Sequence, residues 1–381
     1  MSAGPQRAGR FDIADIVRDH RAELESVVRL TREQKRVLTD IAQCRTAALG
    51  GHVDQCQACG YEHPSYNSCR NRHCPKCQAL AQEKWIAERR TRMLDVRHFH
   101  VVFTLPAQLR PLAAFAPRTV YGALFRCAEQ VLSEFAARRL SATLGATLVL
   151  HTWTRDLRFH PHVHAIVTSG GLSLDQCKWY PDSQRFLFPV AAMRVVFRAK
   201  MLKELRAAYD SGAFERFSEF RDPEAFGRLL QSIARINWHT YAKPSFDTGE
   251  NVLAYLGRYT HRVGIANSRL LAVDTDTVTF RTKGEGKETL TPVEFLRRLV
   301  RHVLPDRFHK IRHLGLYSAA ASRRRETARH LLGQLPVVPS LLPWRERFAQ
   351  LTGRDLSLCP ICNGRLHSFG VVRARAPPEA A

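Results

Sequence analysis

The sequence has no long apolar run and comparatively few acidic residues. No segment approaches the roughly 20 apolar residues that a membrane-spanning helix needs, and the first ten residues contain Gly, Pro and Arg instead of an apolar secretory segment. Against 35 Asp and Glu stand 58 Lys and Arg, which gives the 381 residues a net charge of +23. We therefore expect a cytoplasmic, nucleoid-associated protein whose partner is a polyanion, because cationic side chains release counterions from nucleic-acid phosphates.

Repeats and long low-complexity tracts are also missing, and the hydrophobic fraction of 45% is ordinary for a globular protein. Apolar periodicity predicts helices over residues 117–140 and 190–210. It predicts strands over residues 98–104, 146–153 and 160–168. Hairpin-like strands and separate helices indicate the α+β class and not a doubly wound parallel sheet.

The ten cysteines are clustered along the chain. Without an export signal, their CxxC pairs favour zinc over disulfides. Cys56 and Cys59 precede Cys74 and Cys77, and two such turns supply four thiolates for one tetrahedral zinc ion. The candidate ligands of a second zinc site are Cys44, His52, Cys69 and His73. The alternative is that the two cysteines among them are small buried hydrophobic residues.

A further CxxC pair, Cys359 and Cys362, stands near the end of the sequence. Few other ligand-bearing side chains follow it. The pair is half a zinc site that His367 or another part of the chain completes, or it is a reduced pair with no metal.

Three histidines alternate directly before an apolar, β-branched segment. Side chains alternate along a strand, so His160, His162 and His164 should point the same way. Converging imidazoles bind a divalent metal when a further ligand joins them. A site with open positions for phosphate oxygens suits catalytic Mg²⁺ or Mn²⁺. The alternative is a histidine-rich strand without metal.

Tyr255 and Tyr259 are four residues apart in a segment with helical periodicity, and they should therefore share one helix face. Either phenol can attack phosphorus and form a phosphotyrosine ester, while a metal ion neutralises charge in the transition state. The alternative is that Tyr255 is a core aromatic residue and Tyr259 a surface one. The candidate phosphate contacts are Arg258, Arg262 and Lys243.

Together these motifs resemble the two-tyrosine HUH rolling-circle transposases of insertion sequences, the IS91-like family with an amino-terminal zinc-binding domain. The resemblance covers nearly the whole chain. The segments that carry it are residues 44–52, 66–78, 98–106, 157–164, 255–262 and 308–315. It implies that His162 and His164 are the metal-binding pair and that Tyr255 and Tyr259 are the nucleophiles. The third metal ligand stays open between His160 and a residue from elsewhere.

The resemblance also implies an HUH nuclease core, in which a central antiparallel sheet carries the histidines and the tyrosine helix packs near them. His98 and His100, a second HxH motif, match a core strand of the family and not its metal strand. The expected organisation is a helical, zinc-binding DNA-recognition domain over 1–95 and an HUH endonuclease domain over 96–290. A basic helical carboxy-terminal region with a disordered tail would occupy 291–381.

The resulting hypothesis is a transposase that nicks and rejoins single-stranded or hairpin DNA at element ends. A 5′-phosphotyrosine intermediate would drive rolling-circle transposition, with structural zinc and catalytic Mg²⁺ or Mn²⁺ as cofactors. The alternatives are a plasmid relaxase or replication initiator, and a non-catalytic, zinc-containing DNA-binding regulator. The sequence leaves open the oligomeric state and which tyrosine acts first.

Overall fold

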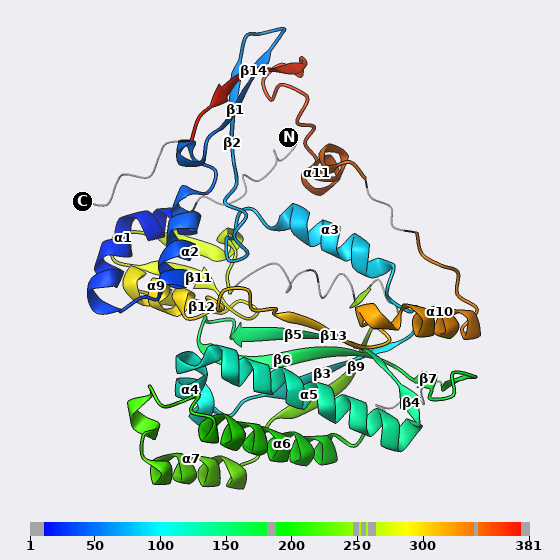
Figure 1. Cartoon of the computed structure of the whole chain (residues 1–381). Coiled ribbons are helices and arrows are strands. Elements are labelled where there is room, and N and C mark those ends of the chain that lie inside the picture. The colour runs from blue at the N-terminus through cyan, green and yellow to red at the C-terminus, as the bar shows by residue number, and fades with distance from the viewer. Residues whose placement is uncertain are drawn as a thin grey trace.

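The computed structural model describes residues 11–180, 188–246, 251–252, 257, 264–338 and 342–374. Figure 1 shows a central sheet between layers of helices, a helical lobe at one end, and a narrow sheet that projects from the molecule. Among the described helices none is long and apolar enough to cross a membrane. The predicted α+β class, with antiparallel sheets, is confirmed.

Five strands form the central sheet, in the order β13-β5-β6-β3-β9, and every neighbouring pair is antiparallel. They are β3 (His98–Thr104), β5 (Gly145–Trp153), β6 (Phe159–Thr168), β9 (Thr240–Phe246) and β13 (Ile311–Gly315). β5 and β6 are consecutive along the chain, and β6 occupies the middle of the sheet. The strands predicted from the sequence over 98–104, 146–153 and 160–168 are confirmed to within one residue.

Four helices cover one face of the central sheet (Figure 1). They are α4 (Arg110–Phe115), α5 (Pro117–Leu140), α6 (Val190–Asp210) and α7 (Pro223–Arg235). Their apolar side chains pack against inward-facing residues of β6, among them Val163 and Ala165, which are fully buried. Because side chains alternate along a strand, burying these residues commits the intervening histidines to the opposite face.

The opposite face of the sheet is partly covered by α3 (Ala79–Arg90) and α10 (Ser322–Leu331). A second apolar cluster lies here and contains Val149 of β5, Ile166 of β6 and Val252. The sheet is therefore sandwiched, and the histidine face is enclosed by packed side chains at one end.

The helical lobe consists of α1 (Ile13–Val27), α2 (Arg32–Gln43), α9 (Pro292–Val300) and the strands β10 (Leu270–Val273), β11 (Val278–Arg281) and β12 (Lys287–Leu290). Asp12 caps α1, and Thr31 with Gln34 forms a capping box that begins α2, so polar caps set both helix starts. Apolar residues of the three helices and of these strands form a separate buried cluster. α9 thus packs with α1 although they are far apart in sequence.

The projecting sheet has the order β14-β1-β2 and is antiparallel throughout. Its strands are β1 (Gly51–Cys56), β2 (Glu62–Tyr66) and β14 (Leu366–Val372). Gly51 is required here because a β-carbon on it would collide with the backbone of Ser65. β14, near one end of the sequence, therefore pairs with a hairpin near the other end (Figure 1).

Shorter elements complete the described chain. They are η1 (Ala47–Leu49), η2 (Ala107–Leu109), β4 (Ala142–Thr143), β7 (Gly171–Ser173), β8 (Trp179–Tyr180), η3 (Ser218–Phe220), η4 (Asn267–Arg269), η5 (Ala319–Ala321) and α11 (Trp344–Thr352).

Residues 291–381 do not form the separate carboxy-terminal region that the sequence suggested, as far as the structure describes them. α9 joins the helical lobe, β13 is an edge strand of the central sheet, and β14 belongs to the projecting sheet. Each of these elements is too short to bury its apolar face alone, so it folds against a complementary face elsewhere.

Candidate active site and metal centres

His151, His162 and His164 form a cluster on one face of the central sheet, called here the histidine cluster. One ring nitrogen from each lies within 4.8 Å of the others. His162 and His164 are two residues apart on β6, and the register of the β5–β6 hairpin places His151 directly opposite His162. The ring centroids of His151 and His164 are 4.2 Å apart. Three imidazoles thus converge from two neighbouring strands.

Burial keeps these imidazoles neutral. It lowers the pKa of His162 to about 4 and holds the pKa of His164 and of His151 well below the usual value. Neighbouring imidazoles and Lys310 lower the pKa of His151 further. A neutral imidazole has a nitrogen lone pair, so all three side chains fit metal ligation near neutral pH.

Hydrogen bonds fix which nitrogen is available on His162. Its Nδ1–H donates to the backbone carbonyl of His160 at 2.6 Å, so Nε2 carries the lone pair. His164 Nδ1 lies 2.6 Å from Nε2 of His100, and the two rings are stacked with an interplanar angle of 8°. Ligation through Nε2 of His164 requires Nδ1–H to donate to His100, which orients the ring as outer-shell partners of metal-bound histidines do.

His160, one candidate for the third ligand, is not part of the histidine cluster. It lies on the same face as His162, but its Nδ1 accepts a hydrogen bond from the Arg110 guanidinium at 3.2 Å. Burial, followed by the Arg110 charge, lowers the pKa of His160. His151 from the adjacent strand replaces it, because cross-strand neighbours in a sheet come closer than residues further along one strand.

His98 and His100 lie on β3, a strand of the central sheet, as the resemblance implied. His98 Nε2 lies 2.7 Å from the Tyr317 hydroxyl, away from the cluster. His100, in contrast, contacts His164 directly and belongs to the surroundings of the site. Strand alternation puts both on the histidine face, and register decides which one reaches the cluster.

Tyr255, Tyr259, Arg258 and Arg262 lie outside the described residues. Two described neighbours bracket Tyr255, and both are helical and buried. Val252 packs in one apolar cluster with Val149 and Ile166, which flank His164 on its face of the sheet. Gly257 lies against Ile86 and Gln82 of α3, and a β-carbon on it would come within 2.4 Å of Ile86 Cδ1, so the end of that side chain would have to move.

Lys243 is exposed on β9, at the edge of the central sheet. Its register partner on β3 is His100, so the two residues share the histidine face. The positive charge of Lys243 lowers the pKa of His100 after the larger effect of burial, to about 4. An exposed cation thus stands beside the cluster.

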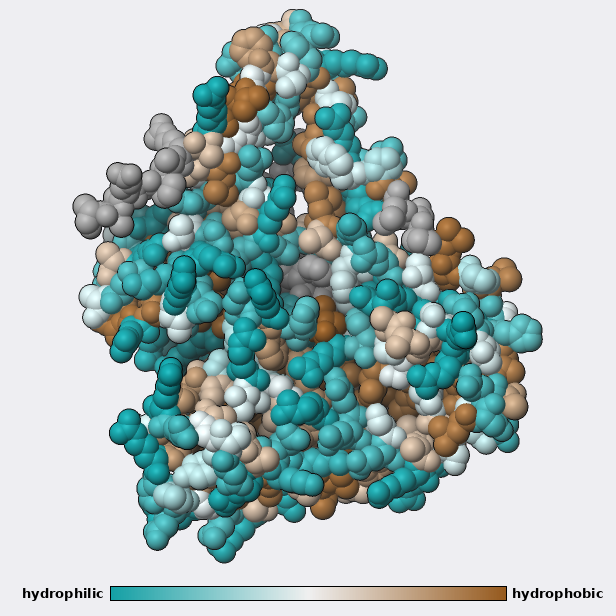
Figure 2. Space-filling model, viewed as in Figure 1, coloured by the Kyte–Doolittle hydropathy of each residue, from teal (hydrophilic) through white to brown (hydrophobic). Residues whose placement is uncertain are grey.

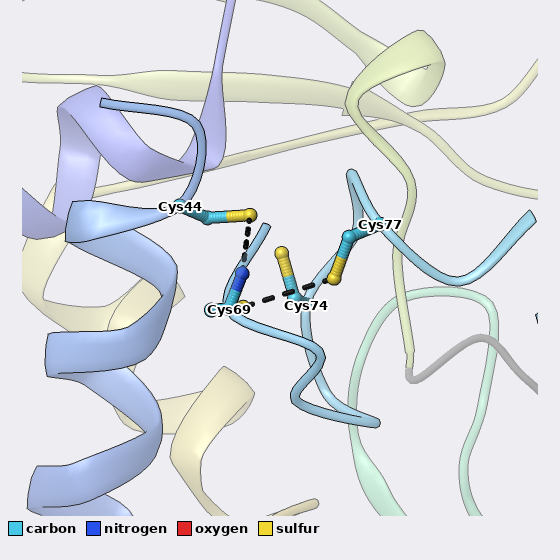
Figure 3. A group of neighbouring side chains, drawn as sticks. All are labelled: Cys44, Cys69, Cys74 and Cys77. Atoms are coloured by element: carbon cyan, nitrogen blue, oxygen red, sulfur yellow. Dashed lines mark hydrogen bonds between the residues drawn. The ribbon is translucent and has the colours of Figure 1, made fainter. Parts of the chain in front are cut away.

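A second set of ligands forms an all-cysteine group in the helical lobe, called here the inner cluster. Its members are Cys44, Cys69, Cys74 and Cys77. Cys44 ends α2, and the others come from the loop before α3; all four side chains point toward one centre (Figure 3). The Cys69 and Cys77 Sγ atoms are 3.7 Å apart, and the Cys69 N–H donates to Cys44 Sγ at 3.5 Å. Four thiols at this spacing match a tetrahedral zinc site.

The expected four-sulfur site of two neighbouring CxxC pairs is therefore wrong. Cys74 and Cys77 belong to the inner cluster. Cys56 and Cys59 lie in a different group, called here the outer cluster. The members of the outer cluster are Cys56, Cys59, Cys359 and Cys362. The reason is β1, whose six extended residues carry Cys56 about 20 Å from the end of the helical lobe.

The two histidines proposed for a second zinc site do not join either cluster. His52 is on β1 with its Nε2 3.3 Å from a carboxylate oxygen of Asp54. His73 donates from Nδ1 to Asn71 Oδ1 at 3.1 Å and accepts the Leu304 N–H on Nε2 at 3.1 Å, and burial lowers its pKa to about 3. Both ring nitrogens of His73 are used, so it links the cysteine loop to the chain after α9.

Sequence comparisons match two family models along the chain. One, described as a transposase zinc-binding domain, matches residues 16–105, and one described as a putative transposase matches residues 145–326. The chain is 41% identical over 372 residues to the putative transposase y4qJ of Sinorhizobium fredii, covering 92% of this chain and 93% of that protein. It is 32% identical over 294 residues to the transposase for insertion sequence element IS801 of Pseudomonas savastanoi pv. phaseolicola, covering 73% and 68%. No solved structure matches it.

The chain belongs to the IS91-like transposase family. This family membership makes it a transposase with an amino-terminal zinc-binding domain, and it implies DNA as a partner. The zinc-binding match contains the whole inner cluster, and the transposase match contains the whole histidine cluster. Structural zinc is thus supported both by the family and by the geometry of the cysteines.

Sequence reasoning about this transposase missed His151 as a member of the histidine cluster. A signal for it exists: His151 stands near the end of the strand that precedes the histidine strand. A hairpin with a short connection places the end of one strand opposite the start of the next. Regular counting from the Trp153–Phe159 pair places His151 next to this strand start, opposite Pro161, and a register irregularity between His151 and Trp153 brings it opposite His162.

Proposed function

We propose that this transposase cuts and rejoins one DNA strand through a tyrosyl ester, next to a divalent metal ion held by the histidine cluster. The observation that carries the proposal is the convergence of three neutral imidazoles on a partly exposed sheet face. The buried Val252, which precedes Tyr255, packs on that same face. The sequence pattern and this neighbour together support Tyr255 and Tyr259 as the nucleophiles.

The donor set fits a catalytic divalent ion. Three imidazoles would leave an ion that takes six ligands with positions open for water and phosphate oxygens. When bound, Mg²⁺ or Mn²⁺ supplies Lewis-acid polarisation of the scissile phosphate and offsets its charge. The chain's own contribution is to hold His162 by the His160 carbonyl and His164 by His100, so that both rings are oriented beforehand.

The proposed reaction exchanges one phosphoester for another. The tyrosine oxygen attacks phosphorus and loses its proton. The bond from phosphorus to the 3′ oxygen breaks, and that oxygen leaves as a 3′ hydroxyl after taking up a proton. The 5′ phosphate stays on the tyrosine, and attack by a 3′ hydroxyl on this ester reverses the step and rejoins DNA without external energy. Two tyrosines allow two such exchanges in one rolling-circle event.

Charge supports DNA as the substrate, and the proposed form of that DNA is a single strand or hairpin at an element end. The net charge of +23 favours phosphate binding. Hydrophilic side chains dominate the face of the molecule shown in Figure 2. Lys243 beside the histidine cluster, with Arg258 and Arg262, is proposed to hold the DNA backbone at the scissile phosphate. We accordingly propose that the protein acts in the cytoplasm at the nucleoid.

The test is a covalent-adduct assay with the full-length protein. A 5′-phosphotyrosine adduct on a single-stranded end oligonucleotide with Mn²⁺ should appear as a shifted, protease-sensitive band. Tyr255→Phe combined with Tyr259→Phe should abolish the band because no phenol remains at either position. Tyr209→Phe is the matched control and should leave it unchanged, since Tyr209 stacks on Phe226 in the helical layer on the other face.

Two results would overturn the proposal. No adduct from wild-type protein with any end strand would favour a non-catalytic DNA-binding regulator. An adduct from the double Phe variant would place the nucleophile elsewhere. A plasmid-type relaxase or initiator would instead nick a plasmid origin and leave element ends uncut.

A further inference from the structure

The outer cluster lies at the projecting sheet, separate from the histidine cluster of the central sheet, and plays no part in the proposed reaction. Cys56 Sγ lies 3.4 Å from Cys362 Sγ, and Cys59 Sγ lies 3.8 Å from Cys359 Sγ. All four sulfurs are within 4.8 Å of one another. A zinc–sulfur distance of about 2.3 Å in a tetrahedron sets sulfurs about 3.8 Å apart, whereas a disulfide needs about 2.05 Å. The spacing therefore matches a tetrahedral thiolate site.

The two CxxC turns of the outer cluster have the same backbone geometry. In the first, the Gly60 N–H donates to the Cys56 carbonyl at 3.0 Å, and Gly60 has a φ of +72°. In the second, the Asn363 N–H donates to the Cys359 carbonyl at 3.0 Å, and Asn363 has a φ of +58°. In both, the N–H of the first cysteine also bonds to the carbonyl five residues on, at 2.9 and 2.8 Å. Two equivalent turns thus face each other across the sulfurs.

Gly364 shows how closely the two turns approach. A β-carbon at this position would lie 3.1 Å from Cys56 Sγ and 3.3 Å from Cys362 Sγ. It would also lie 2.8 Å from the Ala58 β-carbon, closer than real β-carbons come. Glycine therefore lets segments about 300 residues apart bring their thiols together.

The projecting sheet needs such a site because it has almost no apolar core. Of the three hydrophobic clusters found among the described residues, none includes a residue of β1, β2 or β14. Apolar side chains of β14 face solvent: Phe369 is 59% and Val371 81% exposed. Figure 2 shows hydrophobic and hydrophilic residues mixed on this projection. A three-stranded sheet without a core requires a metal or disulfide staple.

We propose that the outer cluster binds a second structural zinc ion, which fastens the carboxy-terminal segment to the amino-terminal hairpin. The ion would join a hairpin and a strand that, among the described residues, belong to none of the three hydrophobic clusters. Cys359 and Cys362 lie outside both matched family regions, and geometry alone assigns them. The site completes the terminal CxxC with Cys56 and Cys59, and not with His367, whose strand position pairs with Gln55.

Zinc content of the full-length protein is the first test. Inductively coupled plasma mass spectrometry should find two zinc ions per chain in the wild type and one in the variant combining Cys359→Ser with Cys362→Ser. Cys177→Ser is the matched control and should keep two zinc ions, since Cys177 is exposed, its Sγ bonds to the carbonyl of Asp175, and it belongs to neither cysteine cluster. One zinc in the wild type, or two in the double Ser variant, would overturn the proposal.

Hydrogen exchange tests what the ion does. The double Ser variant should lose amide protection in β14 and β1 while β6 keeps the protection of the wild type. The single variant Cys362→His should keep most of the wild-type amide protection in β14 and β1, because imidazole is also a zinc ligand. Unchanged protection of β14 in the double Ser variant would contradict a fastening role.

Cobalt substitution keeps the test valid if the Ser variants do not fold. Wild-type protein reconstituted with Co²⁺ should show thiolate-to-metal charge-transfer absorption of two tetrathiolate sites per chain. Absorption of one site would refute the second ion. Thiol titration of denatured, chelated protein without reductant should give all ten cysteines free, and eight would show a disulfide instead.

Discussion

The position of His151 gives the sharpest test of the histidine cluster. Replacing it by Leu keeps a buried side chain of similar volume beside Val149 and removes one of three converging nitrogens. Removing an outer-shell partner of a metal ligand costs about 10- to 100-fold in affinity. Losing a ligand itself should exceed this, so we expect Mn²⁺ binding to weaken at least about 100-fold, which is about 2.7 kcal/mol.

Substitutions of two other histidines give smaller expected losses of Mn²⁺ affinity for comparison. His100→Ala removes the partner of His164 Nδ1, and Mn²⁺ binding should weaken by about 10- to 100-fold. His160→Leu should change it by about threefold or less, under about 0.7 kcal/mol, because the His160 ring bonds to Arg110 outside the cluster. The structure therefore predicts that the loss of Mn²⁺ affinity is largest for His151→Leu, smaller for His100→Ala and smallest for His160→Leu.

The assay is a Mn²⁺ titration of the zinc-loaded, full-length protein, followed by the electron paramagnetic resonance signal of free Mn²⁺. Thermal unfolding of each variant controls for loss of fold, since His151 is only 4% exposed. Wild-type affinity in His151→Leu would refute the assignment. So would an equal loss in His160→Leu, which would return His160 to the site.

Three further predictions address pH, packing and the approach to the site. Burial lowers the pKa of His302 from 6.5 to about 4, so its unfolded form binds more protons. Its contribution to stability is complete well above pH 6.5 and falls by about 2 kcal/mol by pH 5; because other buried histidines contribute in the same direction, urea unfolding followed by Trp fluorescence should show a loss about 2 kcal/mol smaller in His302→Gln than in the wild type. Leu148→Ala, in the core beneath the sheet, should cost about 2–5 kcal/mol of unfolding free energy with Mn²⁺ affinity unchanged; unaltered stability in chemical denaturation would contradict the packing. Gly257→Ala should force the Ile86 side chain out of its place between this segment and α3 and lower adduct yield up to about 10-fold at wild-type zinc content; a normal yield would show that this contact is not needed.

Much of the fold could be predicted because local patterns specify it. α5 and α6 occupy the residues that apolar periodicity predicted, 117–140 and 190–210. The alternation of Val163 with His162 and His164 puts apolar residues in the core and imidazoles on the other face. The carboxy-terminal third could not be predicted in the same way. Its short elements each pack on an element that is distant in sequence, and local sequence patterns do not predict which element that is.

The cysteines show the same limit at the level of a site. Their number and CxxC spacing predicted zinc, but the ligand sets were wrong. Sequence proximity grouped Cys56 with Cys74, whereas β1 separates them and brings Cys56 to Cys362. A metal binds ligands that lie within a few ångströms of one point. The six extended residues of β1 carry Cys56 too far from Cys74 for that, although the two are near in sequence.

The sequence by itself determined the α+β class, the single face shared by His162 and His164, the presence of zinc-binding cysteines and the excess of positive charge. These follow from residue type and from the periods of helix and strand, which are local properties. The tertiary structure alone decided that His151 completes the histidine cluster and that the terminal CxxC joins the first hairpin. Both depend on strand register and chain path, which the packing of the whole molecule fixes.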